Sequence, residues 1–419
     1  MFSLVILVTI LIYSAIIVDL APISDFDIWA DENEVVLNKT GNVRNSKVLN
    51  FIPIPVEEEC LSTDGRRKGV CMNTYECRIQ GGKSHGFCAM GFGVCCVFTA
   101  TCDQDVFNNI TYFVNPHFPD LDIDMSLCLL KIKKIDQEIS QIRLDFVHFN
   151  LGQPNRKTGI CEDDVLLISG GSSNNLSICG YNSDQHVYFD VDNIDEPITM
   201  SMNLSKKVAK RFWEIRVTQI PFSQRAPLSC LQYHTGLTGT IQTMNFAENG
   251  RHLANQDYNI CIRQEKRMCS IIYEPCDENS FRISSNNRQG SVAQMEVTQN
   301  NQLFGNQNQS INVNNDEIEG SGGDFDVGEA RNMDLCVDKI IMPCGSDDFL
   351  MPGDISKEFC SISRCGSSLC PKGENPCKIE TTVTPFSIGV HFGPSSRDNS
   401  SPDDNLGMCL VYKQIECVN

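Results

Sequence analysis

The sequence predicts an all-β protein that is divided into several disulfide-linked modules. The 419-residue chain contains 22 cysteines, an even number. So many cysteines would be a liability as free thiols in the reducing cytosol, so we expect them to form disulfides in an oxidising compartment. No two cysteines stand at Cys-x-x-Cys spacing, which argues against zinc as the alternative use. Apolar and polar residues alternate along the middle of the chain, as they do in half-buried strands. Six Asn-x-Ser/Thr sequons add the prediction of a glycosylated, secreted protein: Asn38, Asn109, Asn175, Asn203, Asn308 and Asn399.

The charge balance excludes one broad class of function. Lys plus Arg number 34 and Asp plus Glu number 53, so the formal net charge is -19. A general nucleic-acid binder needs a basic face that neutralises phosphates. We therefore expect no nucleic-acid partner.

Residues 1–21 are predicted to be a signal peptide, followed by an acidic, proline-containing linker at residues 22–55. The apolar run from Phe2 to Val18 is shorter than the about 20 residues that a spanning helix needs. No Lys or Arg precedes this run and Pro22 follows Ala21, so an uncleaved signal anchor stays open as an alternative. After cleavage we expect an extracellular protein without stable membrane insertion.

Residues 56–98 are predicted to form a small disulfide knot. Six cysteines lie between Cys60 and Cys96, in a segment too short to bury a sufficient apolar core. The spacing alone leaves fifteen pairings open. However, a Gly-x-Cys at Cys71, a third and a fourth cysteine and a terminal Cys95-Cys96 together resemble the clip modules of arthropod secreted proteins. That resemblance implies the pairs Cys60–Cys95, Cys71–Cys88 and Cys77–Cys96.

Residues 99–222 are predicted to form an antiparallel β-sandwich. Alternation is clear in four segments that turn-forming clusters separate: Ile142–Phe146, Val187–Val191, Ile198–Leu204 and Trp213–Val217. Asn115-Pro116-His117-Phe118-Pro119 and Cys179-Gly180 resemble conserved elements of CUB domains, as does Cys161-x-x-Asp164. The resemblance implies a CUB-type sandwich with the disulfides Cys102–Cys128 and Cys161–Cys179.

Residues 223–419 resemble a second CUB domain, from the segment Gly236–Phe246 to the closing Gly407–Gln414. The resemblance implies the pairs Cys230–Cys261 and Cys336–Cys360. Eight further cysteines have no place in the family pattern and are left unpaired: Cys269, Cys276, Cys344, Cys365, Cys370, Cys377, Cys409 and Cys417. Residues 283–333 contain 16 Asn or Gln and no cysteine, which predicts a long disordered insertion in this domain.

The sequence offers no catalytic constellation, so we expect no enzyme and no cofactor. A trypsin-like domain would need Gly-Asp-Ser-Gly-Gly and a histidine in its own motif. Ser321-Gly322-Gly323 follows Gly320 instead, and neither His148 nor His234 has the required context. The seven histidines show no zinc-binding spacing, and phosphate-binding loops are absent.

Calcium is the one ion that the resemblance suggests, because many CUB domains hold it with three acidic residues. In the first domain only Asp164 matches, while Gly152 and Ser205 stand near the other two positions. In the second domain Cys336-x-Asp338 has shifted spacing. Ca²⁺ needs six to eight oxygen ligands, several of them charged, so we expect no metal site.

Two surface motifs keep competing interpretations. Arg66-Arg67-Lys68 is either a solvated turn, a proprotein-processing site or a contact for an acidic partner. Ser321, a Ser-Gly flanked by acidic residues, resembles a glycosaminoglycan attachment signal, and the alternative is a plain solvated linker.

Together these features predict a secreted, non-enzymatic binding or adaptor protein that acts on extracellular proteins or glycans through the loops of its sandwiches. One alternative is a non-catalytic regulator of a serine-protease cascade, whose clip-like module docks a protease or zymogen. Another is a proteoglycan-like component of the extracellular matrix.

Overall fold

A computed structural model describes ten stretches of the chain, all within one compact unit that spans Pro53–Asn419. They are residues 59–121, 125–172, 174–192, 196–208, 210–247, 250–283, 336–343, 362–370, 376–394 and 405–417. Several predictions fall outside them: the signal peptide, the linker, the insertion apart from Ile283, the sequons Asn38, Asn308 and Asn399, and Ser321, Cys344 and Cys360.

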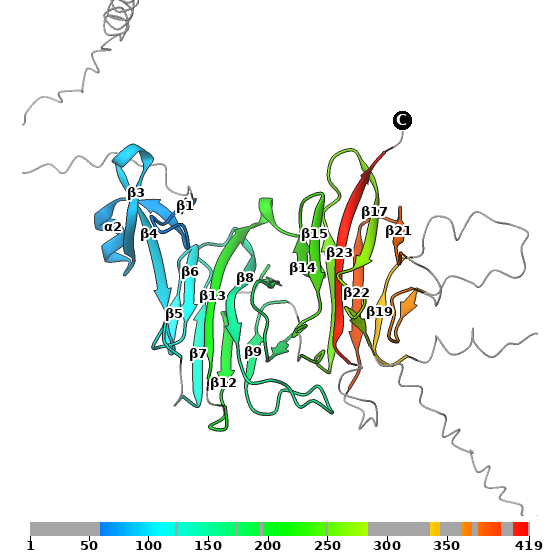
Figure 1. The fold of residues 1–419 in the computed structure, drawn as a ribbon. Helices are drawn as coiled ribbons and strands as arrows, with labels where there is room; N and C mark the ends of the chain where they lie inside the picture. The colour runs from blue at the N-terminus through cyan, green and yellow to red at the C-terminus, as the bar shows by residue number, and fades with distance from the viewer. Residues whose placement is uncertain are drawn as a thin grey trace, which may run out of the picture. The chain divides into compact units, whose positions relative to one another are not determined.

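The first module is a small sheet with one helix (Figure 1). It contains β1 (Glu59–Leu61), β2 (Lys68–Met72), α2 (Thr74–Ile79), β3 (Lys83–Cys88), the 3-10 turn η1 (Ala89–Gly91) and β4 (Gly93–Ala100). Helix α2 begins after Asn73, whose side chain accepts a hydrogen bond of 2.8 Å from the Tyr75 amide.

Three disulfides hold this module together: Cys60–Cys95, Cys71–Cys88 and Cys77–Cys96. These are the pairs that the clip resemblance implies. Two of the glycines in this module, Gly82 and Gly93, lie directly against the sulfur atoms of the bridges. A Cβ on Gly93 would lie 3.0 Å from both Cys71 Sγ and Cys88 Sγ.

The second module is a sandwich of two sheets. Its strands are β5 (Gln104–Val106), β6 (Ile110–Val114), β7 (Leu127–Ile132), β8 (Ile139–Asn150), β9 (Val165–Ser169), β10 (Leu176–Ile178), β11 (His186–Asp190), β12 (Ile198–Asn203) and β13 (Phe212–Pro221). One sheet has the order β10-β9-β12-β7-β5. The other has the order β1-β2-β4-β6-β13-β8-β11, with β3 paired to β4, so it runs without interruption from the first module into the second.

Strand β4 makes this junction. It pairs in parallel with β6 through Phe98 and Thr111, Thr99 and Tyr112, and Ala100 and Phe113. The strand therefore crosses the boundary expected between residues 98 and 99. The two modules share backbone hydrogen bonds rather than a free linker.

The alternation predicted along this sandwich is confirmed. Ile142, Leu144 and Phe146 are buried on β8, and Trp213 and Val217 are buried on β13. Their polar neighbours point to the opposite face of the same sheet because successive side chains of a strand alternate. The protein is thus nearly all β, as predicted, with its core between the two sheets.

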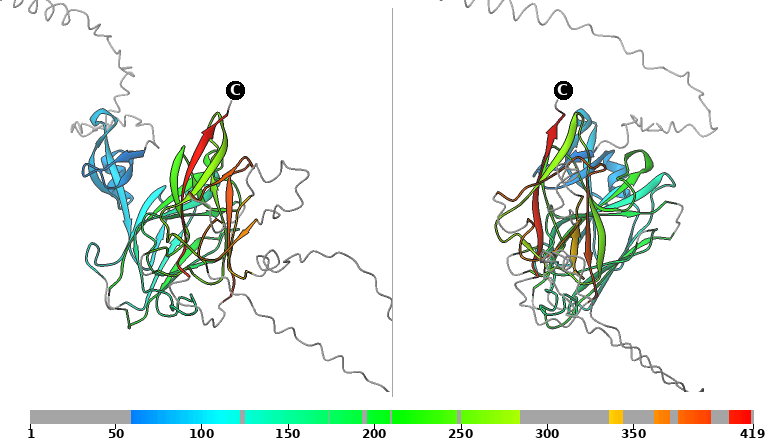
Figure 2. Two further views of the ribbon diagram at one scale, coloured as in Figure 1. Left: turned by 45° about the vertical axis from the view of Figure 1, so that its right-hand side comes forward. Right: turned by 90° about the vertical axis from the view of Figure 1, so that its right-hand side faces the viewer.

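The third module is a second sandwich. Its strands are β14 (Cys230–His234), β15 (Thr238–Gln242), β16 (Gln256–Ile262), β17 (Met268–Pro275), β18 (Phe281–Arg282), β19 (Lys339–Ile341), β20 (Ser363–Arg364), β21 (Ile379–Thr381), β22 (Ser387–Phe392) and β23 (Gly407–Glu416). The sheets have the orders β14-β16-β22-β19-β20 and β15-β23-β17-β21, with β18 on β23. Figure 2 shows the red C-terminal strand β23 within this sandwich.

Disulfides in the two sandwiches agree with the resemblance at Cys102–Cys128, Cys161–Cys179 and Cys230–Cys261. The pair Cys336–Cys360 was wrong, because Cys336 is bonded to Cys365. Strands β19 and β20 are antiparallel, so the chain leading into β19, which contains Cys336, comes close to Cys365 at the end of β20. The structure also supplies pairs that the sequence left open: Cys269–Cys417, Cys276–Cys409 and Cys370–Cys377.

Candidate functional site

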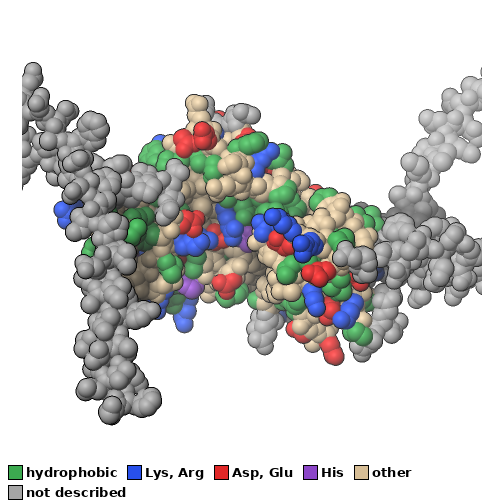
Figure 3. All heavy atoms as spheres, turned by 90° about the horizontal axis from the view of Figure 1, so that it is seen from above, with side chains coloured by type: hydrophobic (Ala, Val, Ile, Leu, Met, Phe, Trp, Pro, Cys, Tyr) green, Lys and Arg blue, Asp and Glu red, His purple; other side chains and the backbone are tan. Residues whose placement is uncertain are grey.

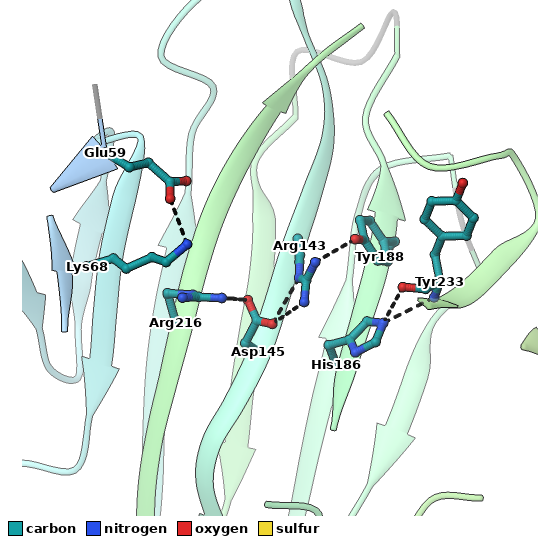
Figure 4. A network of polar contacts seen from close by, with 8 residues as sticks. All are labelled: Glu59, Lys68, Arg143, Asp145, His186, Tyr188, Arg216 and Tyr233. Carbon is teal, nitrogen blue, oxygen red and sulfur yellow. Dashed lines mark hydrogen bonds and ion pairs between the residues drawn. The ribbon is translucent and has the colours of Figure 1, made fainter. Parts of the chain in front are cut away.

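The outer surface of the long sheet carries a row of polar side chains. Strand alternation places Arg143 and Asp145 of β8, Arg216 of β13, and His186 and Tyr188 of β11 on the side away from the core. Figure 4 shows these side chains side by side on neighbouring strands. We call this surface, with its extensions at Glu59 and Lys68 and at Tyr233, the composite face.

A shared carboxylate lies at the centre of the composite face. Asp145 Oδ1 is 2.7 Å from Arg143 Nη2, and Asp145 Oδ2 is 2.9 Å from Arg216 Nη2. Arg143 Nη1 also donates a 2.8 Å hydrogen bond to the Tyr188 hydroxyl. Two guanidinium groups on one carboxylate leave a local surplus of positive charge. This positive surface lies on a chain whose formal net charge is -19.

The first module is fixed to the same sheet by Arg67. Its Nε lies 2.7 Å from Glu214 Oε1, and its guanidinium lies 5.1 Å from the Tyr112 ring centroid and 5.2 Å from that of Phe118. The side chains of Arg67 and Glu214 are only 19% and 7% exposed. Arg67 is therefore part of a packed junction, and the solvated-turn interpretation fits Arg66 alone.

Lys68 extends the composite face toward the first module. Its Nζ lies 2.8 Å from Glu59 Oε2, and its amide donates a 2.7 Å hydrogen bond to the Tyr112 hydroxyl. Both partners of the Lys68–Glu59 pair are about half exposed. In a space-filling view from above, charged side chains of both signs lie next to one another on the surface (Figure 3).

The opposite end of the face belongs to the third module. His186 Nε2 lies 2.9 Å from the Tyr233 carbonyl oxygen and 3.1 Å from its amide nitrogen. The rings of His186 and His234 are 4.8 Å apart. Burial lowers the pKa of His186 to about 4 and that of His234 to about 3, so both imidazoles are neutral at pH 7.

Side-chain bonds around Asn245 hold the two sandwiches together. The backbone N–H of Asn245 donates to Asn182 Oδ1 at 2.7 Å. The side-chain oxygen Asn245 Oδ1 accepts from the backbone N–H of Tyr181 at 2.8 Å. Asn245 Nδ2 also donates to Gln153 Oε1 at 3.1 Å. These bonds join buried polar groups across the junction between the two sandwiches.

Asp164, which alone matches the calcium-binding residues of CUB domains in the first sandwich, is engaged by other groups. Asp164 is fully buried and accepts hydrogen bonds of 2.9 Å from the Gly152 and Ser205 amides. Its two oxygens also lie 2.9 and 3.0 Å from Arg211 Nε and Nη2. The guanidinium of Arg211 thus provides the cation at this carboxylate. The sequence analysis missed Arg211, because no motif links it to Asp164 across 47 residues.

Asp338 of the second sandwich is also engaged by side chains and backbone. Its Oδ1 accepts a 2.7 Å hydrogen bond from the Gly393 amide, and its Oδ2 lies 3.7 Å from His252 Nε2. His252 is buried and stacks on the Phe392 ring at 4.1 Å. Burial lowers the pKa of His252, although the nearby negative charge of Asp338 acts to raise it. In the described part of the chain, no three His, Cys, Asp or Glu side chains are grouped to hold a metal ion.

The remaining predicted site residues are spread over the surface. His148 lies 3.9 Å from Glu214 and packs on Phe212. Of the described sequons, Asn175 and Asn203 are exposed and Asn109 is half-buried. Arg66, at the start of the basic cluster, is exposed.

Comparison with known proteins identifies one part of this architecture. The family model for the animal CUB domain matches residues 227–415. A CUB domain is therefore present in the chain, where the second sandwich lies. No curated protein matches the chain. Among the described residues, no helix is long and apolar enough to cross a membrane.

Solved structures with similarity to the chain include multi-domain CUB proteins. The CUB1-EGF-CUB2 domains of rat MASP-1 are 14% identical, with a TM-score of 0.24, and the match covers 75% of this chain and 100% of that one. The corresponding region of human MASP-1/3 is 14% identical, with a TM-score of 0.23 and coverages of 74% and 100%. The extracellular region of zebrafish Gpr126/Adgrg6 is 10% identical, with a TM-score of 0.25 and coverages of 74% and 36%.

Proposed function

We propose that this protein is a secreted, non-enzymatic binding protein that holds acidic extracellular protein partners on the composite face. The cysteine count, the sequons and the CUB domain support an extracellular role. The central observation is the Arg143–Asp145–Arg216 cluster, in which a half-buried positive surplus lies on a rigid sheet. A fixed charge on a rigid surface favours recognition because little entropy is lost on binding.

The chemistry of the composite face suits recognition better than catalysis. Its carboxylates are committed to ion pairs, and His186 and His234 are neutral because burial depresses their pKa. A general base near neutral pH would need a pKa close to 7 and reach to a substrate proton. These groups instead offer charge and hydrogen bonds in fixed positions.

Cross-linking mass spectrometry in the native extracellular fluid would test the proposal. The chain offers a matched pair of exposed lysines: Lys68 at the composite face and Lys131 on β7 of the other sheet. We expect partner cross-links to form at Lys68 and not at Lys131. Cross-links only at Lys131, or none to any protein, would contradict a partner on the composite face.

The variant Arg143→Gln sharpens the experiment. It removes the positive surplus but leaves the Asp145–Arg216 pair intact. Affinity for the cross-linked partner should fall about tenfold, and the loss should shrink at high salt. Lys131→Gln makes the same charge change on the other sheet and should leave affinity unchanged.

A second candidate function, regulation of a serine-protease cascade through the first module, is favoured by one separate observation. Phe87, Met90 and Phe92 lie within six residues and are 84%, 100% and 64% exposed. Clustered exposed apolar side chains are typical of interaction surfaces. Capture of zymogens from the native fluid by the wild type, lost in Phe87→Ser/Phe92→Ser and kept in Tyr75→Ser, would support this role.

A further inference from the structure

Strands β17 and β23, which lie side by side in Figure 1, are joined by two disulfides in addition to their backbone ladder. Cys276 directly follows β17, and its amide donates a 3.1 Å hydrogen bond to the carbonyl oxygen of Cys409, to which it is also bonded through sulfur. Cys417 directly follows β23, and its amide donates a 2.9 Å hydrogen bond to the Arg267 carbonyl oxygen. The bridge from Cys417 to Cys269 therefore lies at the opposite end of the same strand pair.

The Cys269–Cys417 bridge differs from the other described disulfides in its exposure. Both of its cysteines are exposed. Every other disulfide of the described residues has at least one buried cysteine, and in the neighbouring bridge this is Cys409, which is 3% exposed. Thiol–disulfide exchange requires that an incoming sulfur reaches a disulfide sulfur, so access decides which bridge reacts. In the folded protein, Cys269–Cys417 is the described bridge that is most open to such an attack.

The local strand pairing accounts for this exposure. The register of β17 and β23 shifts between Met268 and Ser270, so Cys269 is an extra residue with no ladder partner on β23. Such a bulge locally disrupts the ladder. In the described residues, the next strand, β21, pairs with β17 only at Ile271–Tyr273, which lies beyond the bulge. Cys269 is therefore not flanked by a further strand.

The fold tolerates the opening of this bridge because a second link joins the same strands. The ladder continues from Ser270 to Pro275, and Cys276–Cys409 holds its far end. The two cysteines of the exposed bridge are 148 residues apart, and those of Cys276–Cys409 are 133 residues apart within the same stretch. A disulfide constrains the unfolded chain through the loop that it closes. Most of this loop stays closed when Cys269–Cys417 opens.

We propose that Cys269–Cys417 is an exchange site at which a small extracellular thiol, such as glutathione, modifies the folded protein. The thiolate of the small molecule attacks Cys417 Sγ, which lies just outside the strand pair. A new S–S bond forms, the Cys269–Cys417 bond breaks, and Cys269 Sγ leaves as a thiolate that takes up a proton. The product carries a mixed disulfide on Cys417 and a free thiol on Cys269. Attack by Cys269 on the mixed disulfide releases the small thiol and restores the bridge, so the cycle needs no further oxidant or reductant.

Reaction of the full-length secreted protein with reduced glutathione, without denaturant, tests this proposal. Free thiols are alkylated with iodoacetamide at successive times, and peptides are analysed by mass spectrometry without reduction. We expect glutathione on Cys417 and alkylation of Cys269. This pair should open about tenfold or more faster than Cys276–Cys409, because access limits exchange at the buried sulfur. The far-UV circular dichroism should stay unchanged.

Two double variants locate the reaction. Cys269→Ser/Cys417→Ser should be secreted with an unchanged circular dichroism spectrum and should take up no glutathione. Cys276→Ser/Cys409→Ser removes the other link between the same strands and should still take up glutathione at Cys417. If this control variant does not fold, the comparison of the two bridges within the wild-type protein decides the matter.

A second arm of the experiment replaces glutathione with thioredoxin and distinguishes a small thiol from a protein dithiol as the reactant. Opening by thioredoxin alone would overturn the proposal. So would equal rates at the two bridges, or a loss of circular dichroism signal that accompanies the adduct, because exchange would then follow unfolding. None of these readouts depends on a partner at the composite face, so this proposal and the proposed function can fail separately.

Discussion

Asp164 and Arg211 form a fully buried ion pair that is almost saturated with hydrogen bonds. The carboxylate accepts two backbone amides and two guanidinium nitrogens, and neither side chain is exposed. A charge in such a place is tolerated only while its partners remain, because the interior solvates it poorly. The stability of the first sandwich therefore depends on Arg211.

We expect Arg211→Gln to lower the free energy of unfolding by about 3–5 kcal/mol, the usual cost of leaving a buried charge unpaired. Urea unfolding followed by tryptophan fluorescence would measure it, since Trp213 lies in the same core. Arg225→Gln is the control. It breaks a part-exposed pair with Asp192 and should cost about 1 kcal/mol or less. Equal losses in both variants would contradict this account.

The same ion pair predicts that the thermal stability of the protein does not depend on calcium. Because a guanidinium already neutralises Asp164, millimolar Ca²⁺ or a chelator should leave the thermal unfolding midpoint of the wild-type protein unchanged. Differential scanning calorimetry checks this directly. A rise of several degrees with Ca²⁺ would mean that another cation site exists.

His186 and His234 predict how stability depends on pH. Their folded pKa values of about 4 and about 3 lie below the ordinary value of 6.5, so the unfolded chain binds more protons between these limits. Stability from this source is complete above pH 6.5 and is lost as the pH falls toward 4, by on the order of 3 kcal/mol for each imidazole. Urea midpoints measured from pH 7.5 to 4.5 should fall less steeply in His186→Gln/His234→Phe. Parallel curves would contradict the assignment.

At the scale of elements, strand β4 joins the disulfide-rich module to the first sandwich. Its pairing with β6 supplies the backbone bonds, while Arg67 locks the side of the junction through Glu214, Tyr112 and Phe118. A cation between an acidic group and two aromatic rings, mostly shielded from water, contributes more than an exposed ion pair.

Arg67→Ala should therefore loosen the junction by about 2 kcal/mol and raise amide exchange in β4 and β6. Hydrogen exchange with mass spectrometry would locate the effect. Its neighbour Arg66 is exposed, so Arg66→Ala controls for the loss of charge and should leave exchange unchanged. A matching effect of both variants would mean that Arg67 has no special role.

At the scale of the whole described unit, the two sandwiches meet through Asn245 and its partners. Gly180 has a φ of +78°, and a Cβ at this position would collide with the Asn245 side chain. Glycine is therefore required both by the backbone conformation and by the closeness of the second sandwich.

Gly180→Ala should weaken the junction between the sandwiches without removing either core. We expect a larger radius of gyration by small-angle X-ray scattering and new protease cleavage between residues 221 and 230. Gly65→Ala is the control: it has a similar φ of +70°, but its Cβ would meet no neighbour within 4 Å. Identical scattering of the two variants would contradict the prediction.

Much of this fold could be predicted from local signals. Alternation at Ile142, Leu144 and Phe146 marked a strand, since the period of two is a property of neighbouring residues. Within short segments, the cysteine spacing resembles known families, and this resemblance implied six pairs that the structure confirms. Cys336–Cys365 was missed because it depends on the pairing of β19 with β20, which no local pattern specifies.

The composite face was beyond sequence analysis for the same reason. Arg143 and Asp145 are outward residues on one strand, and the sequence shows only that they alternate with the core. Their contact with Arg216 depends on the β8–β13 register, and that with Tyr188 on the β8–β11 register. His234 meets His186 only because two modules dock. The one available signal was the polar character of outward positions along apolar strands.

The continuous sheet also has a consequence for how this protein could be cut or recombined. In the intact chain β6 is covered on one side by β13 and on the other by β4. Excision of the disulfide-rich module would strip β4 away and leave β6 as a bare edge, with the Tyr112 ring uncovered beside it. Unprotected edges recruit strands from other molecules. Cleavage here would expose a strand edge that promotes aggregation, so we expect the disulfide-rich module and the first sandwich to be stable only as one piece.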